Sequence, residues 1–98
     1  MEERTEHWSM EQPSRAMIDM AIRKIGSKTR TQWIELLPVR VTVRRTSGEI
    51  EYDWWVIARQ EREDLFAVMQ QHSKAVKSAS LEDLRELNPR LPPFTEAE

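Results

Sequence analysis

The sequence predicts a small α+β domain with an N-terminal helix, an antiparallel sheet of two or three strands, and two C-terminal helices packed on one sheet face. Two observations carry this prediction. Apolar residues alternate with polar ones on either side of a turn at Gly48, and apolar residues recur at helical spacing before and after that region. A chain of 98 residues with 39% hydrophobic content supports a single modest core. We expect an arm over residues 1–12, the domain over 13–88, and an extended Pro-rich acidic tail over 89–98.

The hairpin between residues 39 and 59 is the most strongly specified element. Gly48 can adopt the positive φ that a tight hairpin turn requires. Pairing Arg45 with Ile50 makes every cross-strand pair compatible, whereas a slip by one residue mixes the two faces. The expected pairs are Val43–Tyr52, Val41–Trp54 and Val39–Val56 on the face that packs against the helices, and Arg44–Glu51, Thr42–Asp53 and Arg40–Trp55 on the other face.

The segments before the hairpin predict a helix and a further strand. The helix begins with Pro13 at its first position and is capped at its C-terminus by Gly26. A basic connector over residues 27–31 leads into a strand over residues 32–37. Pro38 cannot donate to a sheet ladder, so residues 31–45 form either one bent strand or two separate strands.

Two helices are expected after the hairpin. Residues 61–64 are mostly acidic and Lys74 and Lys77 are basic, which matches the charge preference of the two ends of a helix dipole. The next helix begins at Ser80, in a sequence that resembles a capping box, and ends at Asn88-Pro89.

Composition limits the function classes. Charged residues make up 33% of the chain, yet the net charge is only -2, so no global attraction to nucleic acid or anionic lipid is expected. The absence of cysteine excludes disulfides and thiolate chemistry. The N-terminus, Met1-Glu2-Glu3-Arg4, is acidic and no apolar run follows it, so we expect no secretory signal, no membrane span and a cytoplasmic location.

Enzymatic chemistry has little support in the sequence. The histidines, His7 and His72, do not have metal-ligand spacing, and no sharp-turn motif presents a serine to His72 and Asp64. Gly26 and Gly48 lie too far apart for a phosphate-binding loop. We therefore expect no enzyme, no cofactor and no metal site.

The strongest functional signal is the face of the hairpin opposite the expected core. It combines large apolar groups with charged ones, a composition typical of a protein-binding hot spot. The expected protein-binding residues are Trp55, Ile57, Arg40, Arg44, Glu51 and Asp53. The sequence leaves open that Trp8 of the arm, or the tail from Leu91 to Phe94, covers this face. These residues predict a small non-catalytic module, a regulator, inhibitor or accessory subunit, that binds another protein or a second copy of itself.

Nucleic-acid binding is the alternative. Five cations lie in the connector and the first hairpin strand, namely Lys28, Arg30, Arg40, Arg44 and Arg45. The expected order of helix, three strands and helix resembles in outline the double-stranded-RNA-binding domain. That family clamps phosphate with a lysine-rich helix start, whereas residues 61–64 here are Glu-Arg-Glu-Asp. The residues that would carry the activity are missing, and the sequence is assigned to no family.

Overall fold

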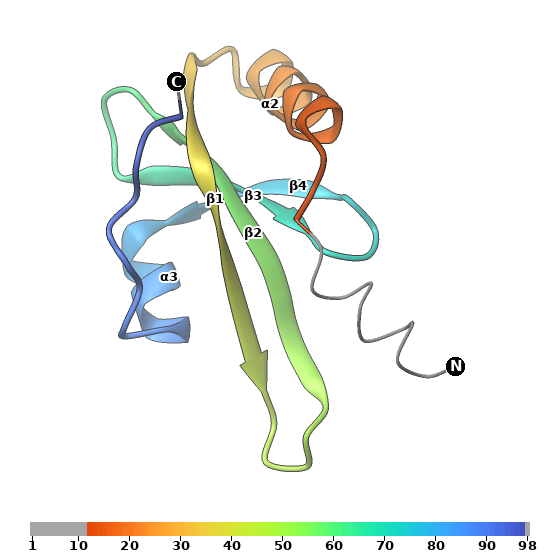
Figure 1. Cartoon of the computed structure of the whole chain (residues 1–98). Helices are drawn as coiled ribbons and strands as arrows, with labels where there is room; N and C mark the ends of the chain where they lie inside the picture. The colour runs from red at the N-terminus through yellow and green to blue at the C-terminus, as the bar shows by residue number, and fades with distance from the viewer. Residues whose placement is uncertain (1–11, 98) are drawn as a thin grey trace.

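A computed structural model describes residues 12–97 of the chain. Within them the fold is α+β, with one helix, four strands and a second, shorter helix (Figure 1). The elements are α2 (Arg15–Thr29), β1 (Trp33–Arg44), β2 (Ile50–Gln60), β3 (Leu65–Gln70), β4 (Val76–Ser80) and α3 (Leu81–Leu87).

The four strands form one antiparallel sheet in the order β1-β2-β3-β4, with a helix on each face. Alternate residues of β2 belong to different apolar clusters, because successive side chains of a strand point to opposite faces. Trp55 and Ile57 pack with Ile18, Ala21 and Ile25 of α2. Val56 packs instead with Leu84 of α3. The expectation that the helices share one sheet face is therefore wrong, because a sheet with two apolar faces requires a layer on each side.

The hairpin register is confirmed for most of its length. The structure pairs Val39 with Val56, Arg40 with Trp55, Val41 with Trp54, Thr42 with Asp53 and Val43 with Tyr52, as the side-chain alternation predicts.

The predicted register is wrong at the far end of the hairpin. Arg44 lies opposite Ile50 rather than Glu51, because a register shift follows Val43. Near the start of β1 another irregularity falls between Glu35 and Val39, around Pro38. β1 is nevertheless one strand, so the single bent strand is the alternative that the structure supports.

α2 begins and ends later in the sequence than predicted. Ser14 is its N-cap and accepts a hydrogen bond from the Met17 amide, so Pro13 precedes the helix. At the other end the helix continues through Gly26 to Thr29, and Arg30 takes the left-handed cap conformation with φ 54°. Gly26 serves close packing, because a Cβ there would lie 3.3 Å from the Thr31 carbonyl oxygen.

The helix predicted after residue 61 is absent, and β3 and β4 take its place. Phe66, Ala67, Val68 and Met69 are consecutive and all buried, because β3 is covered on both faces. A short apolar run of this kind suits a buried strand as well as a helix segment. The β3–β4 turn contains Lys74 with a left-handed φ of 62°, and His72 is exposed in that turn.

The short C-terminal helix is confirmed. Ser80 caps α3 by accepting from the Asp83 amide, and Leu84 is fully buried against the sheet. The chain then returns along the outer edge of β1, where the Leu37 amide donates to the Thr95 carbonyl at 2.8 Å and the Ala97 amide to the Glu35 carbonyl at 2.9 Å. Phe94 anchors this tail on Phe66, with ring centroids 4.6 Å apart.

Candidate functional site

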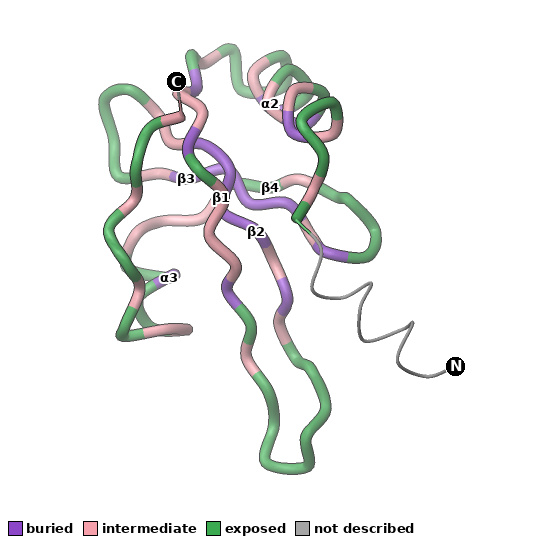
Figure 2. The backbone as a smooth tube through the Cα atoms, viewed as in Figure 1, coloured by how far each residue is buried: buried purple, intermediate pink, exposed green. Residues whose placement is uncertain are grey.

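The first two strands extend beyond the rest of the sheet as a two-stranded hairpin. β3 pairs with β2 only from Trp54 to Arg59, so residues 42–53 of the hairpin extend past the third strand. We call residues 40–53, which include the base of this extension, the ribbon. Figure 1 shows it projecting away from both helices, and Figure 2 shows exposed residues at its far end. The turn closes through an Arg45 amide bond to the Glu49 carbonyl at 2.7 Å, with Gly48 at φ 98°.

A buried ion pair stiffens the ribbon where it joins the body. Arg40 donates from Nε to Oδ1 of Asp53 at 2.9 Å and from Nη2 to Oδ2 at 2.8 Å. The Thr42 hydroxyl donates to Oδ1 at 3.0 Å. The side chain of Asp53 is only 4% exposed and that of Arg40 is 19% exposed. These three residues lock the two strands together on the α2 side of the sheet.

The pKa of Asp53 reflects this environment. Burial by itself raises the pKa of the carboxyl, but the hydrogen bonds from Arg40 and Thr42 and the positive charges of Arg40 and His72 outweigh it, so the pKa lies below its usual value. The same hydrogen bond holds the pKa of Arg40 above its usual value. Asp53 is therefore ionised at neutral pH, and this pair acts as a structural clamp between the strands.

Apolar residues continue along the ribbon as far as Ile50, beside the exposed polar turn over residues 45–49. Val43 and Tyr52 lie opposite each other and are half-buried, and Ile50 at the far end is 39% exposed. We call these three residues the apolar end of the ribbon. Tyr52 contacts Trp54 with ring centroids 5.7 Å apart, and the Lys77 ammonium lies 4.6 Å from the Trp54 ring centroid. Tyr52 packs against the apolar cluster that contains Leu84 of α3. Burial, and then the negative charge of Asp83, raise the pKa of Tyr52.

The outer edge of β1 is also open along the ribbon. The tail pairs with β1 only through Glu35 and Leu37 and the bridge at Leu36. Among residues 12–97, no strand pairs with the outer side of β1 from residue 39 to 44. Backbone groups on such an edge can accept another extended chain.

The structure brings together only part of the predicted protein-binding set. Arg40 and Asp53 are in direct contact, and Arg44 and Glu51 are exposed further along the ribbon, although not opposite each other.

Trp55 and Ile57 are not on an open surface: they are 5% and 0% exposed beneath α2. The expectation of an exposed tryptophan face is therefore wrong. The apolar stripe of α2 covers that face, and the Trp55 indole donates to Oε1 of Gln71. The tail packs on the opposite face, and Trp8 lies outside the described residues.

Sequence reasoning placed Val43 and Tyr52 in the core and did not single out Ile50. The signal that could have found them is length, because residues 65–70 are too few to flank the whole of a hairpin that starts at residue 39. Because β3 is shorter than β1 and β2, one end of the hairpin that these two strands form has no neighbouring strand.

The cations of the nucleic-acid alternative do not form one cluster. Lys28 and Arg30 lie just before β1 starts, whereas Arg44 and Arg45 lie where it ends, at opposite ends of a twelve-residue strand. Arg40 is engaged with Asp53. The four strands and single C-terminal helix also depart from the outline of the double-stranded-RNA-binding domain.

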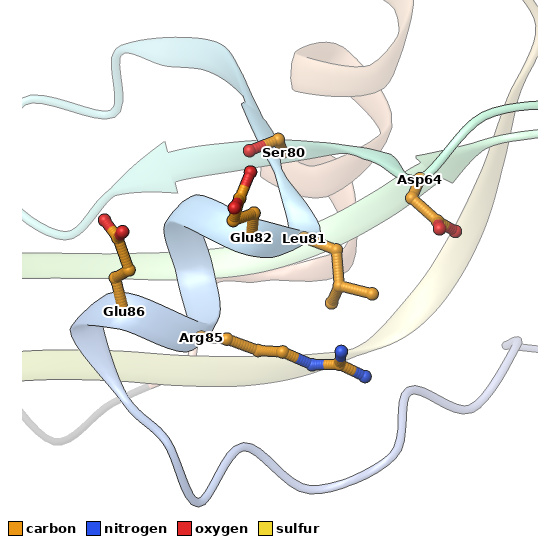
Figure 3. Close-up of a pocket in the computed structure, with 6 residues that line it drawn as sticks. All are labelled: Asp64, Ser80, Leu81, Glu82, Arg85 and Glu86. Carbon is orange, nitrogen blue, oxygen red and sulfur yellow. The ribbon is translucent and has the colours of Figure 1, made fainter.

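A hollow lies between the β2–β3 loop and α3. Figure 3 shows its lining side chains pointing in different directions rather than toward a common point. They belong to Asp64, Ser80, Leu81, Glu82, Arg85 and Glu86. Residues 61–64, three of them acidic, form this loop and do not start a helix, whereas Glu82 and Asp83 occupy the first turn of α3. In the part of the chain that the structure describes, no three histidine, aspartate or glutamate side chains are grouped to hold a metal ion.

Comparisons with protein-family models, with curated proteins and with solved structures found no match to this chain. None of the helices between residues 12 and 97 combines the length and apolar character that a bilayer-crossing helix requires.

Proposed function

We propose that this chain is a small non-catalytic protein-binding module, a regulator, inhibitor or accessory subunit, that contacts its partner through the ribbon. The single observation that carries the proposal is the projection of a two-stranded hairpin whose far end lies beyond both helices and exposes Ile50 among charged residues. A two-stranded hairpin is marginally stable when it stands alone in water. Contact with a partner would bury this end and hold it.

The chemistry of the ribbon suits a protein partner. Val43, Ile50 and Tyr52 supply apolar area, and the Tyr52 ring can add a polar contact through its hydroxyl. Arg44 and Glu51 supply exposed charges near them, which matches an apolar centre with a polar rim. Isolated exposed apolar residues are common on soluble proteins. Ile50 differs from these because it lies at the end of a projecting hairpin.

The open edge of β1 favours an extended segment of the partner. The chain's own tail already pairs antiparallel with this edge, through Leu37 and Thr95. A partner strand added along residues 39–44 would continue the same edge, with main-chain hydrogen bonds for affinity and apolar side chains for selectivity.

The proposal is tested with a pair of matched variants. Ile50→Asp adds a negative charge at the apolar end of the ribbon, and Arg62→Gln changes the net charge by the same amount in the β2–β3 loop, where Arg62 is exposed. Proteins captured from the source cell by the wild-type chain are quantified against both variants, and thermal melts verify folding. We expect Ile50→Asp to weaken capture of a specific partner by about 30-fold, the effect of losing a hot-spot residue, and Arg62→Gln to retain it. Equal capture by all three chains would contradict the proposal.

A further inference from the structure

The solvent face of α2 carries a second charged feature that the ribbon does not use. Its C-terminal half and the residue that follows it present four exposed cations, Arg23, Lys24, Lys28 and Arg30. Seven residues of helix span about 10 Å, so these charges are confined to one end of the helix. Within residues 12–97, none of the four forms an ion pair, whereas Arg15 near the start of α2 is paired with Glu35.

Four cations at one end of α2 are more than the helix needs for its own stability. One or two cations in the last turn complement the helix dipole. Lys24 and Lys28, however, are four residues apart and of like charge, an arrangement that lowers helix stability. Asp19 lies four residues before Arg23 and is the only acidic residue of α2, but no ion pair joins it to Arg23 among the described residues.

Arg30 adds its cation at the residue that directly follows α2. It holds a left-handed backbone conformation, φ 54° and ψ 40°, at a helix end where glycine is the usual residue. Its exposed side chain therefore adds to the positive charge at the same end of the helix as Lys24 and Lys28.

The charge distribution around the sheet indicates which ligand fits. The acidic residues Asp64, Glu82 and Glu86 lie around α3, on the other side of the sheet from α2. The whole chain carries a net charge of -2, so a long polyanion that reaches beyond the four cations also meets the acidic regions, whereas a short acidic segment contacts the local positive surface alone. Among the described residues no tryptophan, tyrosine or phenylalanine belongs to α2, and Trp33 after it is buried, so this surface has no aromatic ring on which a base could stack.

We propose that Arg23, Lys24, Lys28 and Arg30 bind a short acidic segment of a partner protein. Carboxylates on an extended peptide can reach several of these cations at once, and charge-assisted hydrogen bonds to arginine and lysine are stronger than neutral ones. Because the cations are exposed, salt should weaken the contact strongly. This surface is separate from the ribbon, so each can be lost without the other.

The experiment uses the full chain and a fluorescently labelled deca-glutamate peptide, with binding followed by anisotropy at low salt and at about 150 mM salt. The test variant is Lys24→Glu/Lys28→Glu. The control is Arg62→Glu/Arg85→Glu, which changes the net charge equally at exposed arginines elsewhere. A deca-glutamine peptide and a ten-nucleotide single strand complete the probes. If the test variant unfolds in a thermal melt, Lys24→Gln/Lys28→Gln replaces it.

We expect the glutamate peptide to bind at low salt and the test variant to lose about tenfold or more in affinity, while the control loses less than about threefold. We also expect binding to weaken at the higher salt concentration. No binding of the peptide at low salt, equal losses in both variants, or tighter binding of the oligonucleotide than of the peptide would each overturn the proposal.

Discussion

Arg40 on β1 and Asp53 on β2 form a two-point ion pair, with Nε to Oδ1 at 2.9 Å and Nη2 to Oδ2 at 2.8 Å, at the root of the ribbon. This geometry fixes both side chains and ties the two strands together. Thr42 completes it with a hydrogen bond to the same carboxylate.

Replacing Asp53 with asparagine tests this clamp. Asp53→Asn removes the charge that Arg40 binds and should lower the free energy of unfolding by about 2 kcal/mol, because hydrogen bonds to charged groups are strong and Asp53 is buried. The exposed Glu51→Gln is the control and should stay within about 0.5 kcal/mol of wild type. Denaturant unfolding measures both. Equal stability of the two variants would show that the clamp contributes nothing.

The same pair of proteins gives a pH dependence with a definite sign. The pKa of folded Asp53 is lowered, so its ionised form favours the folded state and its contribution is complete above the unfolded pKa of about 3.9. The contribution disappears as the pH falls from there through the lower folded pKa. The stability difference between wild type and Asp53→Asn should therefore be constant from about pH 5 to 7 and shrink in more acidic solution.

The burial of Trp55 predicts a reversal of the mutational pattern that the sequence suggests. Trp55→Ala should cost about 3 to 5 kcal/mol, because it leaves a cavity beneath α2 and removes the hydrogen bond to Gln71. Trp54→Ala should cost less, since Trp54 is only half-buried. Equilibrium denaturation compares them, and a larger loss for Trp54→Ala would mean that the two faces are assigned the wrong way round.

The tail should contribute to stability mainly through its aromatic anchor. Phe94→Ala removes the packing on Phe66 and should cost about 1 to 2 kcal/mol. Glu96→Gln removes the ion pair with Arg59, but the Glu96 side chain is 55% exposed, so the cost should be below about 1 kcal/mol. Urea unfolding of the two variants checks this order, and the reverse order would contradict it.

Arg30 and Lys74 both hold left-handed conformations and allow a matched comparison. Arg30→Gly should raise the free energy of unfolding by about 1 kcal/mol, because glycine adopts this conformation without a steric penalty, and should weaken binding of the deca-glutamate peptide. Lys74→Gly relieves the same strain outside the α2 surface and should leave peptide binding unchanged. A gain in stability with no loss of peptide binding for Arg30→Gly would remove Arg30 from that surface.

The sequence predicts the local features well where a residue pattern has one interpretation. Alternation between residues 39 and 56 defines the register of the hairpin, because any slip would place Val43 against an acidic residue. Ser80 identifies the start of α3 for a similarly local reason.

Which face of the sheet each helix covers is harder to predict, because it depends on the number of strands in the whole sheet. The run from Leu65 to Met69 is apolar throughout, so its periodicity does not separate a buried strand from a helix segment. Interpreting this run as a helix removes two strands from the predicted sheet, and it leaves the Trp55 face without a covering layer in the prediction. The ribbon was equally hard to predict from the sequence, because its projection depends on where β3 begins and ends.

The role of the ribbon in protein binding is tested most directly by photocrosslinking in the source cell, with a benzophenone side chain in place of Ile50 or, in a second chain, of Arg62. Both positions are exposed and both chains should fold. We predict a discrete protein adduct from position 50 that is absent from position 62. No adduct from position 50, the same adducts from both positions, or an adduct with nucleic acid from position 50 would contradict the proposed function.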